Sequence, residues 1–201
     1  MFITFEGIDG AGKTTQINLL KEYFENNSKS VLSLREPGGL KFSEQIRNIL
    51  LDNKTEINNT TELLLFQAAR SELTEKVIIP AINENKIVIC DRFFDSTTAY
   101  QGFGRGIDLD HIFFLNKIST KNLIPDFTFY LKIPIEASLN RNQNKAKDRM
   151  ESNSLEFIKK VKFGFDSLAQ MYPNRIKVIN ADDTIENIHN NILKYLSKWN
   201  I

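Results

Sequence analysis

Residues 2–15, FITFEGIDGAGKTT, constrain the fold more than any other stretch of the chain. They contain Gly7-x-x-x-x-Gly12-Lys13-Thr14, the pattern of a phosphate-binding loop. β-Forming residues precede this loop, and an apolar helical pattern follows it from residue 16. A chance match has odds on the order of one in a hundred for a chain of this length, and the flanking patterns supply the context that the motif requires. The sequence therefore predicts a strand, a phosphate-binding loop and a helix in succession.

Each residue type in this loop has a chemical reason. The glycines allow backbone N–H groups to surround phosphate oxygens, because no Cβ atom lies in the way. The N-terminus of the following helix adds unpaired N–H donors and the positive end of a helix dipole. Lys13 is expected to place its charge between the β- and γ-phosphates of a nucleotide, and the Thr14 hydroxyl is expected to bind Mg²⁺.

Length and composition favour one globular domain with a small mobile insert. The chain has 201 residues, of which 41% are hydrophobic and 25% charged, as is ordinary for globular proteins. A net charge of +1 gives no reason to expect nucleic acid or a membrane as a partner. The single cysteine, Cys90, excludes an intrachain disulfide and is expected in the core. No signal peptide precedes the first strand pattern, and no apolar run approaches about 18 residues, so a cytoplasmic protein is expected.

Strand and helix patterns alternate along the chain. Strands are expected at 2–6, 31–34, 87–90, 127–133 and 176–179, and helices at 14–26, 42–51, 61–82, 110–118, 135–141, 154–171 and 184–199. This alternation predicts an α/β fold in which helices flank a five-stranded parallel sheet as a three-layer sandwich. Together with the phosphate-binding loop, it predicts a fold of the P-loop NTPase type. Ligands of such folds bind at the carboxyl ends of the strands.

Two of these strand ends carry charged residues. Arg35 and Glu36 follow the second strand and precede a Pro-Gly-Gly turn. Asp91 and Arg92 follow the third strand, which is apolar, and an Asp in this position can hold Mg²⁺ directly or through water. Arg92 is expected to bind a second phosphate through both of its terminal nitrogens. A surface ion pair after a core strand is the alternative for Asp91 and Arg92.

Further polar groups are predicted near these strand ends. Phe66 and Arg70 are four residues apart on one helix face, and an aromatic ring beside a forked donor suits a planar base with carbonyl oxygens. Core packing is the alternative for Phe66. Ser96, Thr97 and Gln101 bring hydroxyl and amide groups together, although a capped helix start before a glycine-rich loop would also explain them.

The stretch 139–151 is polar and basic, and it suits a lid that closes over phosphates. Its cations are Arg141, Lys145, Lys147 and Arg149. A solvated loop is the alternative. In the next helix, Asp166 is expected to be solvated.

These motifs together resemble those of bacterial thymidylate kinases, of the P-loop nucleoside monophosphate kinase superfamily. The matching blocks occur in the family's order and span most of the chain. They are Gly7–Thr15, Arg35-Glu36-Pro37-Gly38-Gly39, Phe66-x-x-x-Arg70, Asp91-Arg92, Ser96-Thr97-x-x-Tyr100-Gln101-Gly102 and Asp148-Arg149-x-Glu151.

The resemblance implies transfer of the ATP γ-phosphoryl group to dTMP, giving dTDP and ADP. ATP would be the co-substrate and Mg²⁺ the metal, held by Thr14 and Asp91. The residues that would bind ATP are Gly7, Ile8, Asp9, Gly10, Ala11, Gly12, Lys13, Thr14 and Thr15. The family also implies a homodimer.

For the base and sugar of dTMP, the resemblance implies that Phe66 stacks on thymine and that Arg70 donates to a thymine carbonyl. Thr97 would meet the ring edge, and Tyr100 would lie under the deoxyribose, where a 2′-hydroxyl would clash. Pro37, after a cis peptide bond, would lie beside the thymine methyl group. Glu36, Ser96 and Gln101 complete this substrate set.

For the phosphates, the resemblance implies that Asp9 approaches the 3′-hydroxyl and that Arg92 and Arg35 hold the dTMP phosphate. The loop interior has no arginine, so a lid cation is expected to stabilise the transferring group, and either Arg141 or Arg149 could do so. The expected catalytic set is Lys13, Arg92, Asp9, Arg141 and Arg149.

Two alternatives remain at this point. Another nucleotide kinase is possible, because dUMP differs from dTMP by one methyl group. A GTPase switch is disfavoured, because the guanine-reading Asn-Lys-x-Asp pattern is missing where Asn116-Lys117 is followed by Ile118-Ser119.

Overall fold

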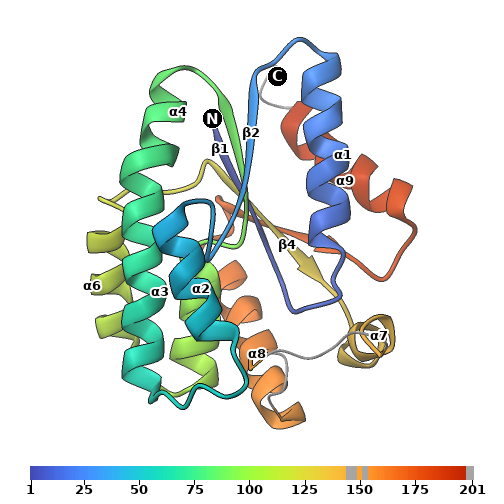
Figure 1. Cartoon of the computed structure of the whole chain (residues 1–201). Coiled ribbons are helices and arrows are strands. Elements are labelled where there is room, and N and C mark those ends of the chain that lie inside the picture. Colours follow the sequence, from blue (N-terminus) through green and yellow to red (C-terminus); the bar gives the residue numbers. More distant parts are fainter. Residues whose placement is uncertain (144–148, 151–153, 198–201) are drawn as a thin grey trace.

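The structure is a computed structural model and describes residues 1–143, 149–150 and 154–197. Within these residues, five parallel strands form one sheet in the order β2-β3-β1-β4-β5 (Figure 1). They are β1 (Phe2–Glu6), β2 (Val31–Arg35), β3 (Ile87–Asp91), β4 (Phe127–Lys132) and β5 (Ile176–Asn180). The prediction of a five-stranded parallel sheet is confirmed, and each strand lies within one residue of its expected bounds.

Helices flank this sheet on both sides. Figure 1 shows α1 (Lys13–Asn26) and α9 (Ile185–Leu196) on one side, and α2 (Lys41–Leu51), α3 (Asn59–Leu73), α4 (Ile79–Asn83) and α6 (Leu109–Ser119) on the other. The remaining described helical segments are the π-helix η1 (Thr74–Ile78), α5 (Phe94–Thr97), the π-helix η2 (Thr98–Gly104), α7 (Ile135–Arg141) and α8 (Leu155–Met171). The α/β sandwich is therefore confirmed.

Successive side chains of each strand point to opposite faces of the sheet, and both faces are buried. Ile3 and Phe5 of β1 belong to a core with Leu20 and Phe24 of α1. Phe2 of the same strand belongs to a second core, beneath the α3–η1–α4 segment. Because both faces are covered, the strands are almost continuously apolar, as expected for a parallel sheet. Cys90 is buried in the second core, as predicted.

The helical pattern expected at 61–82 is longer and less regular than predicted. It begins at Asn59, where the Asn58 side chain caps the helix by accepting from the Thr61 N–H. It then passes through the π-helical turn η1 before α4 begins, so one predicted helix is three segments.

The alternative of a capped helix start before a glycine-rich loop is wrong, because this region is helical through α5 and η2. Its glycines serve close packing. A Cβ atom at Gly102 would lie 2.7 Å from the Leu109 side chain, and one at Gly104 would lie 2.7 Å from the Phe157 ring. The glycines therefore allow η2 to approach α6 and α8. A sequence pattern cannot distinguish glycines that permit such tertiary packing from glycines that form a turn.

The prediction that Asp166 is solvated is also wrong. Its carboxylate lies 2.8 Å from the Lys132 amino group and 3.3 Å from that of Lys162, and the Tyr130 hydroxyl donates to it at 3.1 Å. Asp166 thus joins α8 to the end of β4.

Among the described helices, none combines the length and the apolar character needed to cross a membrane.

Candidate active site

The phosphate-binding loop lies between the end of β1 and the start of α1. Gly7, Gly10 and Gly12 have positive φ angles of 138°, 79° and 90°, which glycine adopts without strain. A Cβ atom at Gly7 would lie 2.6 Å from the Leu131 backbone oxygen. The first turn of α1 carries no side-chain cap, so its N–H groups remain available to an anion.

Lys13 is buried beneath this loop. Its amino group donates to the Gly7 and Ile8 carbonyl oxygens at 3.2 and 3.4 Å and lies 3.9 Å from the Asp9 carboxylate. Burial, together with the nearby Arg92 charge, lowers the pKa of Lys13. These contacts hold the amino group against the backbone of the loop.

Thr14 and Asp91, the two residues predicted to hold a metal, lie in contact. The Thr14 hydroxyl donates to the Asp91 carboxylate at 3.2 Å. One hydroxyl and one carboxylate are hard oxygen donors, which suit an Mg²⁺ ion that keeps most of its ligands as water and substrate phosphate. No cluster of three or more His, Cys, Asp or Glu side chains suited to a metal occurs among the described residues.

Arg92 occupies the centre of the site. Its backbone has a φ angle of +69°, a conformation that turns the chain sharply after β3. The guanidinium donates to the Gly7 carbonyl oxygen at 3.0 Å, to Ser96 Oγ at 3.0 Å and to the Asp9 carboxylate at 2.6 Å. It also lies 5.2 Å from the centre of the Tyr100 ring. Arg92 is therefore a rigid cation that joins the loop to α5 and η2.

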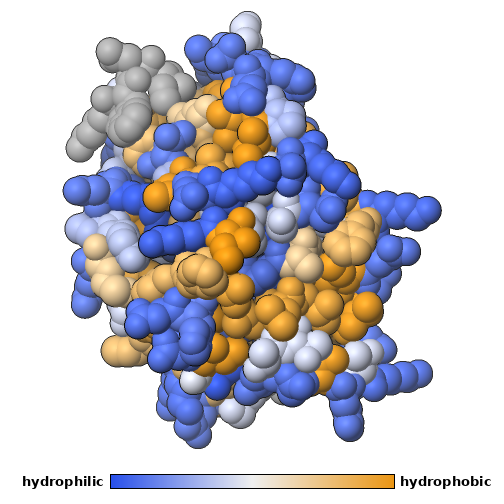
Figure 2. Space-filling view, turned by 90° about the vertical axis from the view of Figure 1, so that its left-hand side faces the viewer, coloured by the Kyte–Doolittle hydropathy of each residue, from blue (hydrophilic) through white to orange (hydrophobic). Residues whose placement is uncertain are grey.

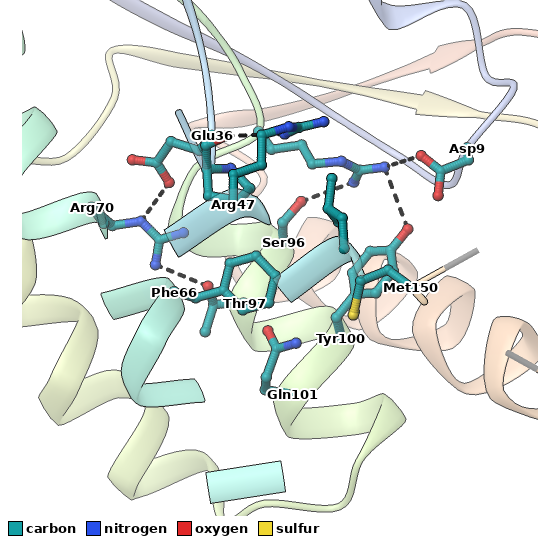
Figure 3. Close-up of a pocket in the computed structure, with 13 residues that line it drawn as sticks. Asp9, Glu36, Arg47, Phe66, Arg70, Ser96, Thr97, Tyr100, Gln101 and Met150 are labelled. Carbon is teal, nitrogen blue, oxygen red and sulfur yellow. Dashed lines mark hydrogen bonds and ion pairs between the residues drawn. The ribbon is translucent and has the colours of Figure 1, made fainter. Parts of the chain in front are cut away.

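A first pocket opens between α2, α3 and η2 (Figure 3). Phe66 and Tyr100 present their rings to it, with Arg70 at one end and Asp9 at the other. The Glu36–Pro37 peptide bond is cis, as the resemblance implied. The lining residues are Asp9, Glu36, Pro37, Arg47, Leu51, Phe66, Arg70, Arg92, Ser96, Thr97, Tyr100, Gln101 and Met150.

Arg70 is buried in the wall of this pocket and makes several hydrogen bonds that its sequence pattern does not indicate. Its side chain is only 2% exposed, and Nε donates to Glu36 at 2.7 Å. Its terminal nitrogens donate to Thr97 Oγ1, to the Phe93 carbonyl oxygen and to Gln67 at 2.9, 3.2 and 3.4 Å. The guanidinium thus forms part of the framework of the pocket as well as one of its walls.

A second hollow lies over the phosphate-binding loop. Arg141, at the end of α7, lines it and donates to the Gly10 carbonyl oxygen at 3.3 Å. Arg35 also lines it and pairs with Glu44 at 3.3 Å. The two hollows share Asp9, Glu36, Arg47 and Arg92. A ligand in one can therefore reach a ligand in the other.

Known proteins of one family match nearly the whole chain. The family model described as thymidylate kinase matches residues 5–192. The chain is 49% identical to thymidylate kinase of Chlorobium luteolum, over 98% of this chain and 97% of that protein. It is 44% identical to thymidylate kinase of Kosmotoga olearia, over 96% and 94%. A crystal structure of thymidylate kinase from Ehrlichia chaffeensis has a TM-score of 0.79 at 40% identity, covering 98% of each chain.

The chain belongs to the thymidylate kinase family. It is accordingly an enzyme, a dTMP kinase. The GTPase alternative is thereby not supported.

Not all residues expected at the thymidylate kinase site come together. Arg141 reaches the hollow over the loop, whereas the Arg149 guanidinium lies 2.7 Å from Glu62 of α3, and its Nε donates to the Leu50 carbonyl oxygen at 2.7 Å. A role for Arg149 at the phosphates stays a prediction, since it requires these bonds to break. Lys145, Lys147, Asp148 and Glu151 lie outside the described residues.

Sequence reasoning missed Glu6, which ends β1 and is fully buried. Its carboxylate accepts hydrogen bonds from the Phe93 N–H at 2.7 Å and from the Ser96 N–H and hydroxyl. It therefore caps α5 and holds the turn that carries Arg92. Burial, and then the charge of Asp95, raises the pKa of Glu6 to about 7. The sequence signal that could have identified Glu6 was an acidic residue at the end of an apolar strand, directly before the glycines of the loop.

Arg47 of α2 was also missed. It lines both hollows, and its guanidinium donates to the Pro37 carbonyl oxygen at 2.9 Å. Nothing in its local sequence distinguishes it from a surface arginine of an amphipathic helix, because its place depends on how α2 packs.

Proposed function

We propose that the enzyme transfers the γ-phosphoryl group of Mg-ATP to the 5′-phosphate of dTMP, giving ADP and dTDP. The observation that carries this proposal is the meeting of two hollows at Asp9 and Arg92. One hollow ends at the phosphate-binding loop, and the other ends at Phe66 and Arg70. Donor and acceptor phosphates bound in them would face each other, which is the alignment that phosphoryl transfer requires.

The donor phosphates are proposed to lie on the loop N–H groups and the start of α1. Lys13 would then exchange its loop carbonyl partners for phosphate oxygens, which are the stronger acceptors because they are charged. Since charge spreads over the γ-phosphoryl oxygens during transfer, a fixed ammonium at this point lowers the barrier.

The metal is proposed to bind at Thr14 and Asp91, the oxygen donors that the loop and β3 bring together. When bound, Mg²⁺ neutralises negative charge on the phosphates of the donor. The Thr14 hydroxyl and the Asp91 carboxylate would orient it.

The acceptor phosphate is proposed to bind to Arg92, with Arg35 and Arg47 beside it. Arg92 is held by Asp9 and Ser96 before substrate arrives, so little ordering is needed on binding. No catalytic base is required, because the attacking group is already an anionic phosphate oxygen. Asp9 has a second proposed role at the sugar 3′-hydroxyl.

The thymine base is proposed to stack on Phe66, with Arg70, Thr97 and Gln101 at its polar edge. Tyr100 would lie under the deoxyribose. The lining of the first pocket by an aromatic ring and a few polar groups is typical of a site for a planar ligand.

Arg141 is proposed as the cation that reaches the transferring group, since it lines the hollow over the loop. The chain is proposed to act as a single domain, 1–201, with a lid at about 140–151, part of which lies outside the described residues.

A homodimer is proposed from the family together with one apolar surface. Leu64 of α3 and Phe114 and Ile118 of α6 are 50%, 63% and 57% exposed. Figure 2 shows hydrophobic atoms gathered on the face of the molecule that carries these helices. A second copy would bury this surface, and light scattering of the wild-type protein against Phe114→Lys tests the association.

A coupled ADP-release assay tests the main proposal. The purified enzyme is incubated with ATP and one of dTMP, dUMP, dCMP, AMP or GMP, with Mg²⁺ and with a chelator. The expected result is Mg²⁺-dependent turnover that is fastest with dTMP. Faster turnover of AMP, GMP or dCMP, or full turnover in the presence of the chelator, would overturn it.

A further inference from the structure

Glu62 is a buried carboxylate of α3 for which the proposed reaction has no role. It is 1% exposed and lines neither hollow. It accepts from Gln101 Nε2 at 2.9 Å, from Arg105 Nε and Nη2 at 3.1 and 3.2 Å, and from Arg149 Nη1 at 2.7 Å. All of these groups are donors, so they require an acceptor at this position.

The charge of this carboxylate is stabilised where it lies. Burial by itself raises the pKa of Glu62, but the hydrogen bonds from Arg105 and Gln101 and the Arg105 charge outweigh it, so the pKa is lowered. Glu62 is therefore ionised at neutral pH and can only accept hydrogen bonds.

An acceptor at this position determines which way the Gln101 amide faces. The two ends of an amide have nearly the same shape but opposite hydrogen-bonding character. With Nε2 committed to Glu62, Oε1 lies at the opposite end. Figure 3 shows this oxygen directed toward the Phe66 and Thr97 side of the pocket. Within the described part of the chain, it accepts no hydrogen bond.

We propose that Glu62 is a positioning residue for base recognition, which holds the Gln101 amide with its oxygen toward the base. The inference rests on the proposed role of the first pocket as the base site. A thymine or uracil ring offers an N3–H donor to such an oxygen. A cytosine ring offers a bare N3 acceptor, and two acceptors facing each other in a buried site are unfavourable. Glu62 thus favours bases with a ring N–H without touching them.

The test compares three acceptor nucleotides in the wild-type enzyme and in Glu62→Gln. 5-Methyl-dCMP keeps the methyl group of dTMP but has an N3 acceptor, whereas dUMP keeps the N3–H but lacks the methyl group. A glutamine at position 62 both donates and accepts, so it no longer imposes one orientation on the neighbouring amide. The kcat/KM ratio of dTMP to 5-methyl-dCMP is expected to fall by about tenfold or more, while the ratio of dTMP to dUMP stays within about twofold.

Two further variants distinguish a positioning role of Glu62 from a general loss of protein stability. Asp95→Asn removes another buried carboxylate, which pairs with Arg175 at 2.6 Å and lines neither hollow. It should reduce thermal stability and leave both ratios unchanged. Gln101→Met removes the acceptor itself and should reproduce the fall in the dTMP to 5-methyl-dCMP ratio, with no further fall when Glu62→Gln is added.

Several results would overturn the inference. One is an unchanged ratio of dTMP to 5-methyl-dCMP in a folded Glu62→Gln variant, and another is an equal fall in both ratios. If Glu62→Gln does not fold, Gln101→Met decides, because an unchanged ratio there contradicts the acceptor role on its own. Wild-type enzyme that does not phosphorylate dTMP would instead contradict the proposed function, so the two failures are distinguishable.

Discussion

Replacing Arg70 with methionine is expected to destabilise the whole protein as well as weaken dTMP binding. Arg70 and Glu36 form an ion pair at 2.7 Å, and their side chains are 2% and 4% exposed. Arg70→Met leaves Glu36 without its cation in a buried site. Burial already raises the pKa of Glu36 against the opposing effect of Arg70, so the lone carboxylate must either take up a proton or remain as an unpaired buried charge.

The expected loss of unfolding free energy follows from the burial of this ion pair. Removing one partner of a buried ion pair costs about 3–5 kcal/mol, a large share of the roughly 5–15 kcal/mol that stabilises a domain. Removing both charges, as in Arg70→Met with Glu36→Met, leaves no unpaired charge and should recover part of this loss, by about 2 kcal/mol. In the Arg70→Met variant, folded Glu36 keeps its proton at pH values where the unfolded chain has lost it, so the stability deficit of this variant grows as pH rises above the ordinary glutamate pKa.

Urea unfolding of wild type, both single variants and the double variant forms a complete cycle. Far-ultraviolet circular dichroism, which follows the helices, and near-ultraviolet circular dichroism, which follows buried aromatic side chains such as Tyr130, should give coincident transitions, which supports a two-state treatment. The reasoning fails if Arg70→Met costs less than about 1 kcal/mol, or if the two substitutions add to within about 0.5 kcal/mol. In that case the pair is not a desolvated unit, and Arg70 is available chiefly for the base.

Four other outcomes are expected. Lys13→Ala should lower kcat by about 100-fold or more with little change in melting temperature, and near-normal turnover would remove Lys13 from the mechanism. Phe66→Ala should weaken dTMP binding by roughly 1–3 kcal/mol while ATP affinity, measured by calorimetry, stays the same; lower thermal stability without loss of dTMP affinity would indicate a core role. Arg141→Ala should reduce kcat by about tenfold or more with little change in KM for dTMP, and an effect confined to KM would exclude a transition-state contact. For Glu6, whose folded pKa of about 7 lies above its ordinary 4.5, the wild type should lose about 3 kcal/mol of unfolding free energy relative to Glu6→Gln as pH rises through this range; parallel stability curves by urea unfolding would contradict the raised pKa.

Much of this architecture is predictable from sequence because its signals are local. A run such as Ile87–Asp91 is apolar over one strand length and ends in an acid, which predicts both a buried strand and a polar group at its carboxyl end. The phosphate-binding loop is equally local, because its glycines, Lys13 and Thr14 follow one another directly and act through the backbone around them. The order of residues along the chain was therefore enough to predict the sheet, the phosphate-binding loop and the residues that lie at the strand ends.

Tertiary packing alone decided which of these groups pair. Glu6 meets Phe93 across 87 positions, and Arg149 meets Glu62 across 87 positions as well. No periodicity or motif records such contacts, because burial and charge compensation arise only when distant elements pack. The same holds for Gly102, whose missing Cβ makes room for Leu109 within a helical segment where a glycine-rich loop was the alternative. The sequence by itself determined which chemical groups this enzyme carries and near which strand ends. The packed structure decided which carboxylate pairs with which arginine, because those pairs join elements that are distant in the chain.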